Sequence, residues 1–333
     1  MVLGNLTPAA TQHDRPAFDV FQGFALCAVL SSLETTGALD VLVRDGGWDG
    51  LAADGEEPLA AELLRYLTER GMVCHRDGRY ELTPLAEAVR ADIGYLVWLC
   101  GGYGVPLRSI GEFLTGALSY GGDIGRDGRG VAVGSALVGA RDLVPPAREL
   151  LDGVGIDHVV DLGCGNARFL LSVCRAADAG GLGLDVNADA CAEARREIDA
   201  AGAGDRIAVR CADAGALDGI PELARTDLVI AFFLLHEILA DGRPALVGYL
   251  RNLAGRLPDG AHLLVAEVSP DPARPAGGHL FNPEFTLVHA MMRQRLMDES
   301  GWRETFADGG FELVRAVHPR MPGSLLMLAR KGA

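Results

Sequence analysis

The clearest chemical pattern in the sequence is a glycine-rich turn in the segment VVDLGCGNARF, which contains Asp161, Gly163 and Gly165. Glycines at such a turn let the backbone come close to a ligand, and the amino terminus of the following helix favours anionic groups. Dinucleotide-binding folds carry GxGxxG at the same place, but here the third glycine is missing. The segment therefore predicts a cofactor site at the end of a strand.

Two further acids follow this turn, each at the end of a predicted strand. Asp185 ends the strand GLGLDV, 24 residues after Asp161, where its carboxylate could accept both hydroxyls of a ribose. Asp213 follows the next strand, in the segment CADAGAL, where its carboxylate could meet an adenine amino group. Together the acids predict a cofactor that contains adenosine.

The motif DLGCGNA and its spacing to Asp185 and Asp213 resemble those of the class I S-adenosylmethionine (SAM) methyltransferases. The resemblance covers residues 158–235 and implies a Rossmann-like domain that binds SAM. The alternative is an NAD-binding Rossmann domain. The residues implied to contact SAM are Asp161, Gly163, Gly165, Asp185, Val186, Asp213, Ala214 and Phe232.

A second group of candidate residues follows the apolar run DLVIAFFLL, in the segment LLHEILADGR. The chain resembles the two-domain plant-type O-methyltransferases, in which a His of a His-Asp-Trp segment at this place is the general base. His236 occupies that position, with Glu237 in place of Asp and Ile238 in place of Trp. The resemblance implies that His236 is catalytic, and the two replacements depart from the family pattern.

The segment PEFTLVHAMMRQ adds a second histidine, His289. His236, Glu237 and His289 offer two imidazoles and one carboxylate, a set that suits non-haem iron and can also hold zinc. The arrangement resembles bacterial α-keto acid C-methyltransferases of the phenylpyruvate type, which bind a metal through a His–acid pair and a His before Met-Met. That resemblance also implies that Arg126, in the segment GRDGRG, contacts the substrate carboxylate.

Each of these residues also has a simpler interpretation. Phe285, His289, Met292 and Leu296 would share one helical face, so His289 could be a core histidine. Glu237 could be an acid that the dipole favours at a helix amino terminus. Arg126 could be a solvated loop arginine.

Strands and helices alternate from His158 to the end of the chain, which predicts an α/β fold with a parallel, doubly wound sheet. A closing hairpin, FELVRAVHP with SLLMLARK, should add one antiparallel edge strand. We expect a winged-helix-like dimerisation domain over residues 1–110, a connector and helix over the active site at 111–150, and the SAM-binding domain at 151–333. The glycines of the connector predict a mobile segment.

The first part of the chain carries the winged-helix pattern. Predicted helices over 18–33, 34–43 and 60–69 precede two strand-like runs that flank Asp77-Gly78, the strongest short hairpin signal. Winged helices often bind DNA, but these helices carry few basic residues. Their apolar faces favour a role in homodimerisation or in covering the substrate.

Composition limits the possible partners and locations. The 333 residues include 30 Lys+Arg and 45 Asp+Glu, a formal charge of −15, which argues against nucleic acid or an anionic membrane as partner. We find no uninterrupted apolar run of about 18 residues and no signal-peptide pattern at the amino terminus, and so predict a cytoplasmic protein. The seven cysteines form no CxxC pair, and Cys27, Cys100, Cys174 and Cys211 are expected to be small core residues.

The sequence thus favours a SAM-dependent C-methyltransferase acting on carbon 3 of a 2-oxo (α-keto) acid, with a metal ion, iron or zinc, on His236, Glu237 and His289. Such an enzyme could supply a β-methyl amino acid for secondary metabolism. The first alternative is a metal-independent O-methyltransferase with His236 as general base, oriented by Glu267 or Glu237. The second is a winged-helix regulator that senses SAM, against which the acidic charge and the complete set of site acids argue.

Overall fold

The computed structural model describes residues 15–48, 56–270, 281–321 and 323–332. The chain divides into two compact units, Met1–Val138 and Gly139–Ala333.

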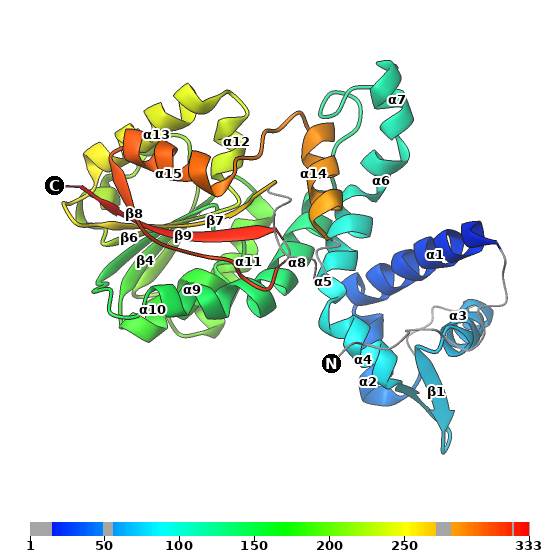
Figure 1. Cartoon of the computed structure of the whole chain (residues 1–333). Helices are drawn as coiled ribbons and strands as arrows, with labels where there is room; N and C mark the ends of the chain where they lie inside the picture. Colours follow the sequence, from blue (N-terminus) through cyan, green and yellow to red (C-terminus); the bar gives the residue numbers. More distant parts are fainter. Residues whose placement is uncertain (1–14, 49–55, 271–280, 322, 333) are drawn as a thin grey trace. The chain divides into compact units, whose positions relative to one another are not determined.

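The first unit begins with helices and a short hairpin, as the winged-helix pattern predicts (Figure 1). Asp77 and Gly78 have φ values of 48° and 81°, the left-handed conformation that a two-residue hairpin turn requires. The elements are α1 (Pro16–Thr35), α2 (Ala38–Asp45), α3 (Glu57–Glu69), β1 (Val73–Arg76), β2 (Arg79–Leu82) and α4 (Pro84–Ala91).

The glycine-rich part of this unit is largely helical. It contains α5 (Ile93–Leu96), the π-helical segment Val97–Gly102, α6 (Tyr103–Arg108), α7 (Ile110–Thr115) and α8 (Gly128–Val138). A Cβ atom on Gly130 would lie 2.6 Å from the carbonyl carbon of Gly101, and one on Gly134 would lie 2.5 Å from the backbone nitrogen of Trp98. These two glycines thus let α8 pack against the π-helical segment. The division between the two units, after Val138, falls inside the range 111–150 that we expected to be a connector.

We expect Gly134→Ala to lower the stability of the first unit. The added methyl would meet the Trp98 backbone, which cannot move aside unless α8 shifts as a whole, and overpacking of this kind costs roughly 1–3 kcal/mol. The matched control is Gly111→Ala in α7, where a Cβ meets nothing within 4 Å. Thermal unfolding followed by circular dichroism should show a lower Tm for Gly134→Ala alone. Equal Tm values would contradict the packing role.

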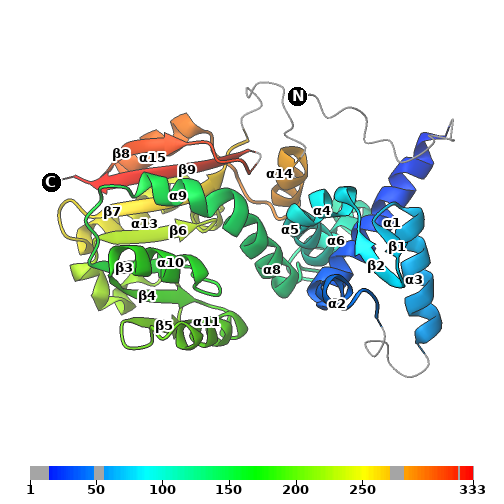
Figure 2. The same cartoon turned by 90° about the horizontal axis from the view of Figure 1, so that it is seen from below.

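The second unit is built on a seven-stranded sheet of order β5-β4-β3-β6-β7-β9-β8 (Figure 2). Five neighbouring strands from β5 to β7 are parallel, whereas β9 is antiparallel to both β7 and β8. The strands are β3 (His158–Leu162), β4 (Gly180–Asp185), β5 (Ile207–Cys211), β6 (Leu228–Phe232), β7 (His262–Val268), β8 (Phe311–Val317) and β9 (Ser324–Lys331).

The antiparallel strand is not at the edge of the sheet, contrary to expectation. β9 lies one position inside, and β8 forms the edge. The first six residues of β9 are all buried, whereas β8 mixes buried and exposed positions. A continuously apolar strand gains more from an interior position that covers both of its faces, and the mixed strand suits the edge.

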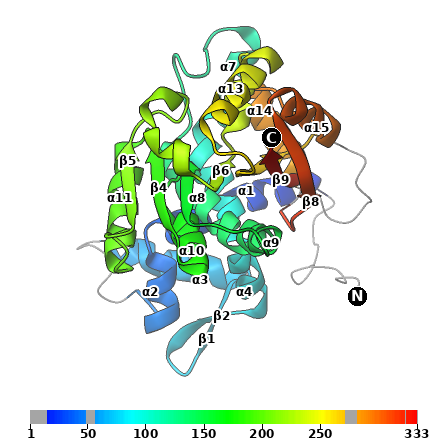
Figure 3. The same cartoon turned by 90° about the vertical axis from the view of Figure 1, so that its left-hand side faces the viewer.

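Helices cover both faces of this sheet (Figure 3). One face packs against α9 (Val144–Leu150), α10 (Arg168–Ala177) and α11 (Ala188–Ala200) through side chains such as Leu170, Val173 and Ile198. The other packs against α12 (Leu235–Leu239), α13 (Arg243–Arg256) and α15 (Glu299–Asp308) through Leu250, Trp302 and Phe306.

The helix that carries His289 is shorter than the sequence suggests. α14 spans Phe281–Met291 and does not continue to Leu296, because Arg293 has a φ of 59°, outside the right-handed helical region. Met292 and Leu296 therefore lie beyond the helix. The prediction that they share a helical face with Phe285 and His289 is wrong.

An exposed apolar surface runs along α1. Phe18, Val20, Phe21 and Phe24 expose between 37% and 74% of their surface. With a mean hydropathy of 1.4, this helix is long and apolar enough to cross a membrane by length and composition alone. Its sequence contains no uninterrupted apolar run of this length because Asp19 and Gln22 are polar. Core helices and signal sequences pass the same test, so the cytoplasmic location stays a prediction.

All seven cysteines lie in the described residues and are free thiols. Cys174 is buried as expected, and Cys27 and Cys100 are half-buried. Cys211 is exposed, so its assignment to the core is wrong. The reason is topological: Cys211 ends β5, which is an edge strand of the sheet.

Candidate functional site

The glycine-rich turn lies after β3, next to the ends of β4 and β6. Gly163 and Gly165 have φ values of 83° and 52°, a conformation that disfavours other residues. The backbone N–H groups of Gly163 and Cys164 both donate to the carbonyl of Leu184, at 2.8 and 2.9 Å. In an open α/β sheet, ligands bind at the carboxyl ends of the strands where the strand order reverses, and this turn lies at that point.

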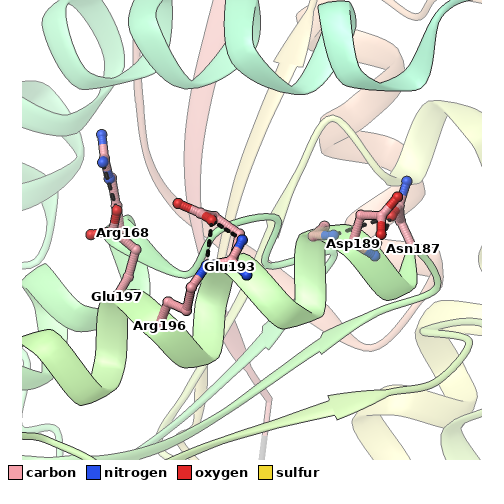
Figure 4. Close-up of polar contacts among 7 residues, drawn as sticks. Arg168, Asn187, Asp189, Glu193, Arg196 and Glu197 are labelled. Atoms are coloured by element: carbon pink, nitrogen blue, oxygen red, sulfur yellow. Dashed lines mark hydrogen bonds and ion pairs between the residues drawn. The ribbon is translucent and has the colours of Figure 1, made fainter.

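Asp185 ties this turn to the start of α11. Its carboxylate accepts hydrogen bonds from the N–H groups of Gly165, at 2.9 Å, and Asn187, at 2.8 Å. Asn187 in turn caps α11 by accepting from the N–H groups of Asp189 and Ala190 (Figure 4). Two carboxylate oxygens are therefore fixed in direction at the end of β4.

The helices behind the turn are also linked. Arg168, the first residue of α10, donates to Glu197 of α11 at 2.6 Å, and within α11 Arg196 pairs with Glu193 (Figure 4). The first pair joins two helices that both start at the predicted cofactor site.

Asp161, at the end of β3, is only 4% exposed. Burial, and second the negative charge of Asp185, raise the pKa of Asp161 to about 7. A strongly shifted carboxyl group beside a ligand-binding turn is a candidate functional group.

We expect Asp161→Asn to stabilise the protein at alkaline pH. In the wild type the unfolded carboxyl group ionises near its ordinary pKa of 3.8, whereas the folded one keeps its proton to about pH 7. Stability is therefore lost as pH rises from about 4 to about 7 and stays lower above that, by up to about 4 kcal/mol for a shift of this size. The carboxamide stays neutral, so the difference in Tm should grow over this range and level off.

The control for this prediction is Asp205→Asn, which changes an exposed carboxylate. Its Tm should follow that of the wild type at every pH. A Tm difference for Asp161→Asn that does not change between pH 5 and pH 8 would show that Asp161 ionises normally in the folded protein.

The remaining predicted cofactor residues lie at the ends of β4, β5 and β6. Asp213 accepts the N–H of Gly215 at 2.7 Å, and the carbonyl of Ala214 accepts the hydroxyl of Tyr249 at 2.9 Å. Val186 is 69% exposed, an unusual state for an apolar side chain beside a buried strand.

Phe232 ends β6 and stacks on Phe169, with ring centroids 4.8 Å apart. Phe169 was not predicted as a site residue. Its signal was its place in the first turn of the helix that follows the glycine-rich turn.

His236 is the first of two buried imidazoles. Its Nδ1 lies 2.6 Å from Oε2 of Glu267, and its backbone N–H donates to Oε1 of the same carboxylate at 3.2 Å. Glu267 comes from β7 and is fully buried. Phe233, with a φ of 54°, turns the chain from β6 into α12 and so directs His236 toward Glu267. The sequence had suggested Glu267 only as one possible orienting residue.

His289 lies beside His236, with ring centroids 4.8 Å apart. It is 2% exposed, stacks on Phe285 at 3.9 Å and has its Nδ1 2.8 Å from the Phe285 carbonyl. A carbonyl and a carboxylate are acceptors, so each histidine carries its proton on Nδ1. When such a ring is neutral, Nε2 is the nitrogen with a lone pair, which can bind a metal or accept a proton.

The other two predicted substrate-site residues are placed differently. Glu237 is exposed on α12, and in the described ranges no group of three or more His, Cys, Asp or Glu side chains is arranged to hold a metal ion. Arg126 belongs to the first unit, where its Nη1 donates to the hydroxyl of Tyr103 at 3.5 Å. The structure therefore brings together the two predicted imidazoles, of His236 and His289, but does not place the carboxylate of Glu237 with them as a third ligand.

Comparison with known proteins identifies the family. Residues 159–260 match the family described as a methyltransferase domain. The chain is 30% identical to 2-ketoarginine methyltransferase of Streptomyces arginensis, over 95% of this chain and 96% of that one. It is 31% identical to indolepyruvate C-methyltransferase of Streptomyces griseus, over 78% and 77% of the two chains.

The fold is shared with solved structures. An O-methyltransferase family protein from Burkholderia thailandensis superimposes with a TM-score of 0.66 at 17% identity, over 97% of this chain and 99% of that one. The α/β unit and the helical amino-terminal unit both have counterparts at this coverage. The chain thus belongs to the class I SAM-dependent methyltransferases, in the group that resembles the plant-type O-methyltransferases.

Proposed function

We propose that this methyltransferase transfers the methyl group of SAM to carbon 3 of a 2-oxo acid. The observation that carries the proposal is the buried pair of His236 and His289, whose Nδ1 atoms are both held by acceptors. The names of two relatives, 2-ketoarginine methyltransferase and indolepyruvate C-methyltransferase, point to the same substrate class.

The two imidazoles fit a metal site, since each has its Nδ1 proton hydrogen-bonded and its Nε2 lone pair directed elsewhere. Iron or zinc would be held by His236 and His289, with Glu237 as third ligand once its exposed side chain turns toward them. A bound metal would supply Lewis acidity that stabilises negative charge on the keto oxygen while carbon 3 gives its proton to solvent water.

The chain's own residues position the reactants. Glu267 fixes the ring of His236, and the backbone carbonyl of Phe285 fixes that of His289. The turn after β3 and the carboxylate of Asp185 would hold SAM, so that its methyl carbon lies about 3 Å from carbon 3 in line with the bond to sulfur. The substrate carboxylate is assigned to Arg126 by resemblance.

Asp161 would make SAM binding depend on pH. SAM carries a positive sulfonium, which favours an ionised carboxyl group close to it. Because the pKa of Asp161 is raised to about 7, SAM affinity should increase as pH rises through about 7. Asp161→Asn should remove this increase, as measured by calorimetry between pH 6 and pH 8.

The test of the proposal is a screen of 2-oxo acids with SAM, in which mass spectrometry follows the gain of one methyl group on carbon. Aliphatic, aromatic and guanidino side chains should all be included. Metal content is measured on the same freshly purified protein. Stoichiometric metal that is lost in His289→Ala supports the proposal. Metal-free protein with full activity on a hydroxyl substrate contradicts it.

A second candidate is supported by one specific observation. The contact of 2.6 Å between His236 and Glu267 is also the arrangement of a general base with its orienting carboxylate. In that case His236 would take the proton of a phenol or alcohol, and the enzyme would be a metal-independent O-methyltransferase. Methylation on oxygen with no metal present would favour this candidate.

We also propose that the enzyme is a homodimer formed through the first unit. The exposed Phe21 and Phe24 lie on α1 with Val20, and monomeric proteins rarely expose a contiguous apolar patch. Light scattering at micromolar concentration should give twice the mass of 35.1 kDa. Replacing both phenylalanines by Ser should produce the monomer, whereas Val314→Ser on the exposed side of β8 should not. A monomeric wild type would contradict the proposal.

A further inference from the structure

Two thiols from neighbouring elements lie close together beside Asp185. Cys191, in the first turn of α11, has its Sγ 3.4 Å from the carbonyl oxygen of Asp185. Cys211 ends β5, is paired with Asp185 in the sheet and has its Sγ 3.6 Å from the carbonyl oxygen of Val186. The Sγ of Cys191 also lies 3.9 Å from the carbonyl oxygen of Arg210, the residue before Cys211, so the sulfurs of two different elements lie close together next to the residue assigned to the ribose.

The two thiols differ in access to solvent. Cys191 is fully buried, whereas Cys211 is the exposed one of the seven cysteines. Burial, and second the contact with Cys211, raise the pKa of Cys191 above its ordinary value. An oxidant in solution therefore reaches Cys211 first, and Cys191 is in place as its resolving partner.

We propose that Cys191 and Cys211 form a redox-sensitive dithiol whose oxidation by a hydroperoxide weakens SAM binding. This inference rests on the assignment of Asp185 to the SAM site. The thiolate of Cys211 attacks a peroxide oxygen, the O–O bond breaks, and a sulfenic acid and one water or alcohol form. The sulfur of Cys191 then attacks that of Cys211, and the S–O oxygen leaves as water with the proton of Cys191. Two thiols are oxidised and one peroxide is reduced.

Disulfide formation would disturb the SAM site because the two sulfurs contact the backbone carbonyls of Asp185 and Val186 in the reduced protein. A covalent bond must draw α11 and the end of β5 closer than two thiols in contact, and it removes both S–H hydrogen bonds to the carbonyls of Asp185 and Val186. The carboxylate of Asp185 is held by the N–H groups of Gly165 and Asn187, and Asn187 lies only four residues before Cys191 at the start of α11. A shift of the backbone between Asp185 and Asn187 would therefore move the carboxylate of Asp185 away from the ribose position.

A second thiol pair in the chain provides a built-in comparison. Cys27 and Cys100 also lie near each other, but both are half-buried in the first unit. Burial, and second Cys100, raise the pKa of Cys27 to about 12, so this thiol stays protonated and reacts slowly. Mild oxidation should therefore select the pair at Asp185.

The experiment treats the reduced full-length enzyme with hydrogen peroxide and measures the Kd for SAM by calorimetry. The wild type should lose affinity at least ten-fold and two of its seven thiols, peptide mapping should find Cys191 linked to Cys211, and dithiothreitol should restore the affinity. Cys211→Ser should bind SAM normally when reduced and be insensitive to peroxide. Cys191→Ala should stop at the sulfenic acid. Cys100→Ser is the matched control and should behave as the wild type.

Three results would overturn the inference: seven free thiols after oxidation, an unchanged Kd in spite of the crosslink, or the same loss of affinity in Cys211→Ser. The experiment measures SAM binding alone, so a protein that methylates no 2-oxo acid would contradict the proposed function and leave the redox inference unaffected. If Asp185→Ala binds SAM as well as the wild type, the assignment of the ribose site fails. That result can be distinguished from a failure of the Cys191–Cys211 dithiol to respond to peroxide.

Discussion

Glu267→Gln should lower kcat by about a hundred-fold to ten-thousand-fold while the protein stays folded. The carboxylate of Glu267 accepts both the Nδ1 proton and the backbone N–H of His236, but a carboxamide has one acceptor oxygen. If the oxygen faces the backbone, the amide NH₂ faces Nδ1 and the ring must carry its proton on Nε2 instead. If the oxygen faces the ring, the backbone N–H meets a donor and His236 is displaced.

The effect should be on the chemical step. In the first arrangement Nε2 can neither bind a metal nor accept a proton, so both candidate reactions fail, while the Kd for SAM should change little. The matched control is Glu284→Gln on the exposed side of α14, which should keep full activity. Single-turnover rates and thermal unfolding separate this effect from misfolding. A Glu267→Gln enzyme with nearly normal kcat would show that the orientation of His236 is unimportant.

The predicted cofactor site rests on local signals, which explains why the sequence located it well. Gly163, Gly165 and Asp185 lie in a strand–turn–helix–strand unit, where spacing along the chain fixes spacing in space. The helix expected after this turn is α10, Arg168–Ala177, whose buried positions Leu170, Leu171 and Cys174 follow a helical period. The hairpin at Asp77-Gly78 was predictable for the same reason, since its two turn residues fix the pairing.

Features that depend on contacts between distant segments of the chain could not be predicted from local sequence patterns. The contact of Glu267 with His236 joins residues from β7 and α12, 31 positions apart, and no local pattern encodes it. The insertion of β9 between β7 and β8 is decided by burial across the whole sheet. The exposure of Cys211 follows from the edge position of β5, which the composition of its own segment does not reveal.

Glycines were the signal most open to misinterpretation. In the sequence Gly130 and Gly134 indicate a mobile connector, whereas in the structure they let α8 approach the π-helical segment. Gly163 and Gly165, in contrast, have left-handed backbone conformations and open space around their missing side chains. Close packing and unusual φ values both favour glycine, and only the neighbours in space distinguish the two.

The relation between His236 and His289 decides between the two candidate reactions. If both hold one metal, loss of either should abolish removal of the proton from carbon 3, and the double variant should be little worse than each single variant. Residues that act as one unit show such non-additivity. The observable is solvent deuterium exchange at carbon 3 of a 2-oxo acid, with metal present and SAM absent, because it reports proton removal alone.

The choice of variants follows from the packing of the two rings. His236→Ala removes the ring that Glu267 holds, and His289→Leu keeps an apolar side chain against Phe285. Phe285→Leu is the matched control, since it disturbs the same packing but retains both imidazoles, and it should keep most of the exchange. The expected result is background exchange in both histidine variants. Rapid exchange in His289→Leu would remove His289 from the metal site, reduce it to a core residue, and leave His236 with Glu267 as the base of an O-methyltransferase.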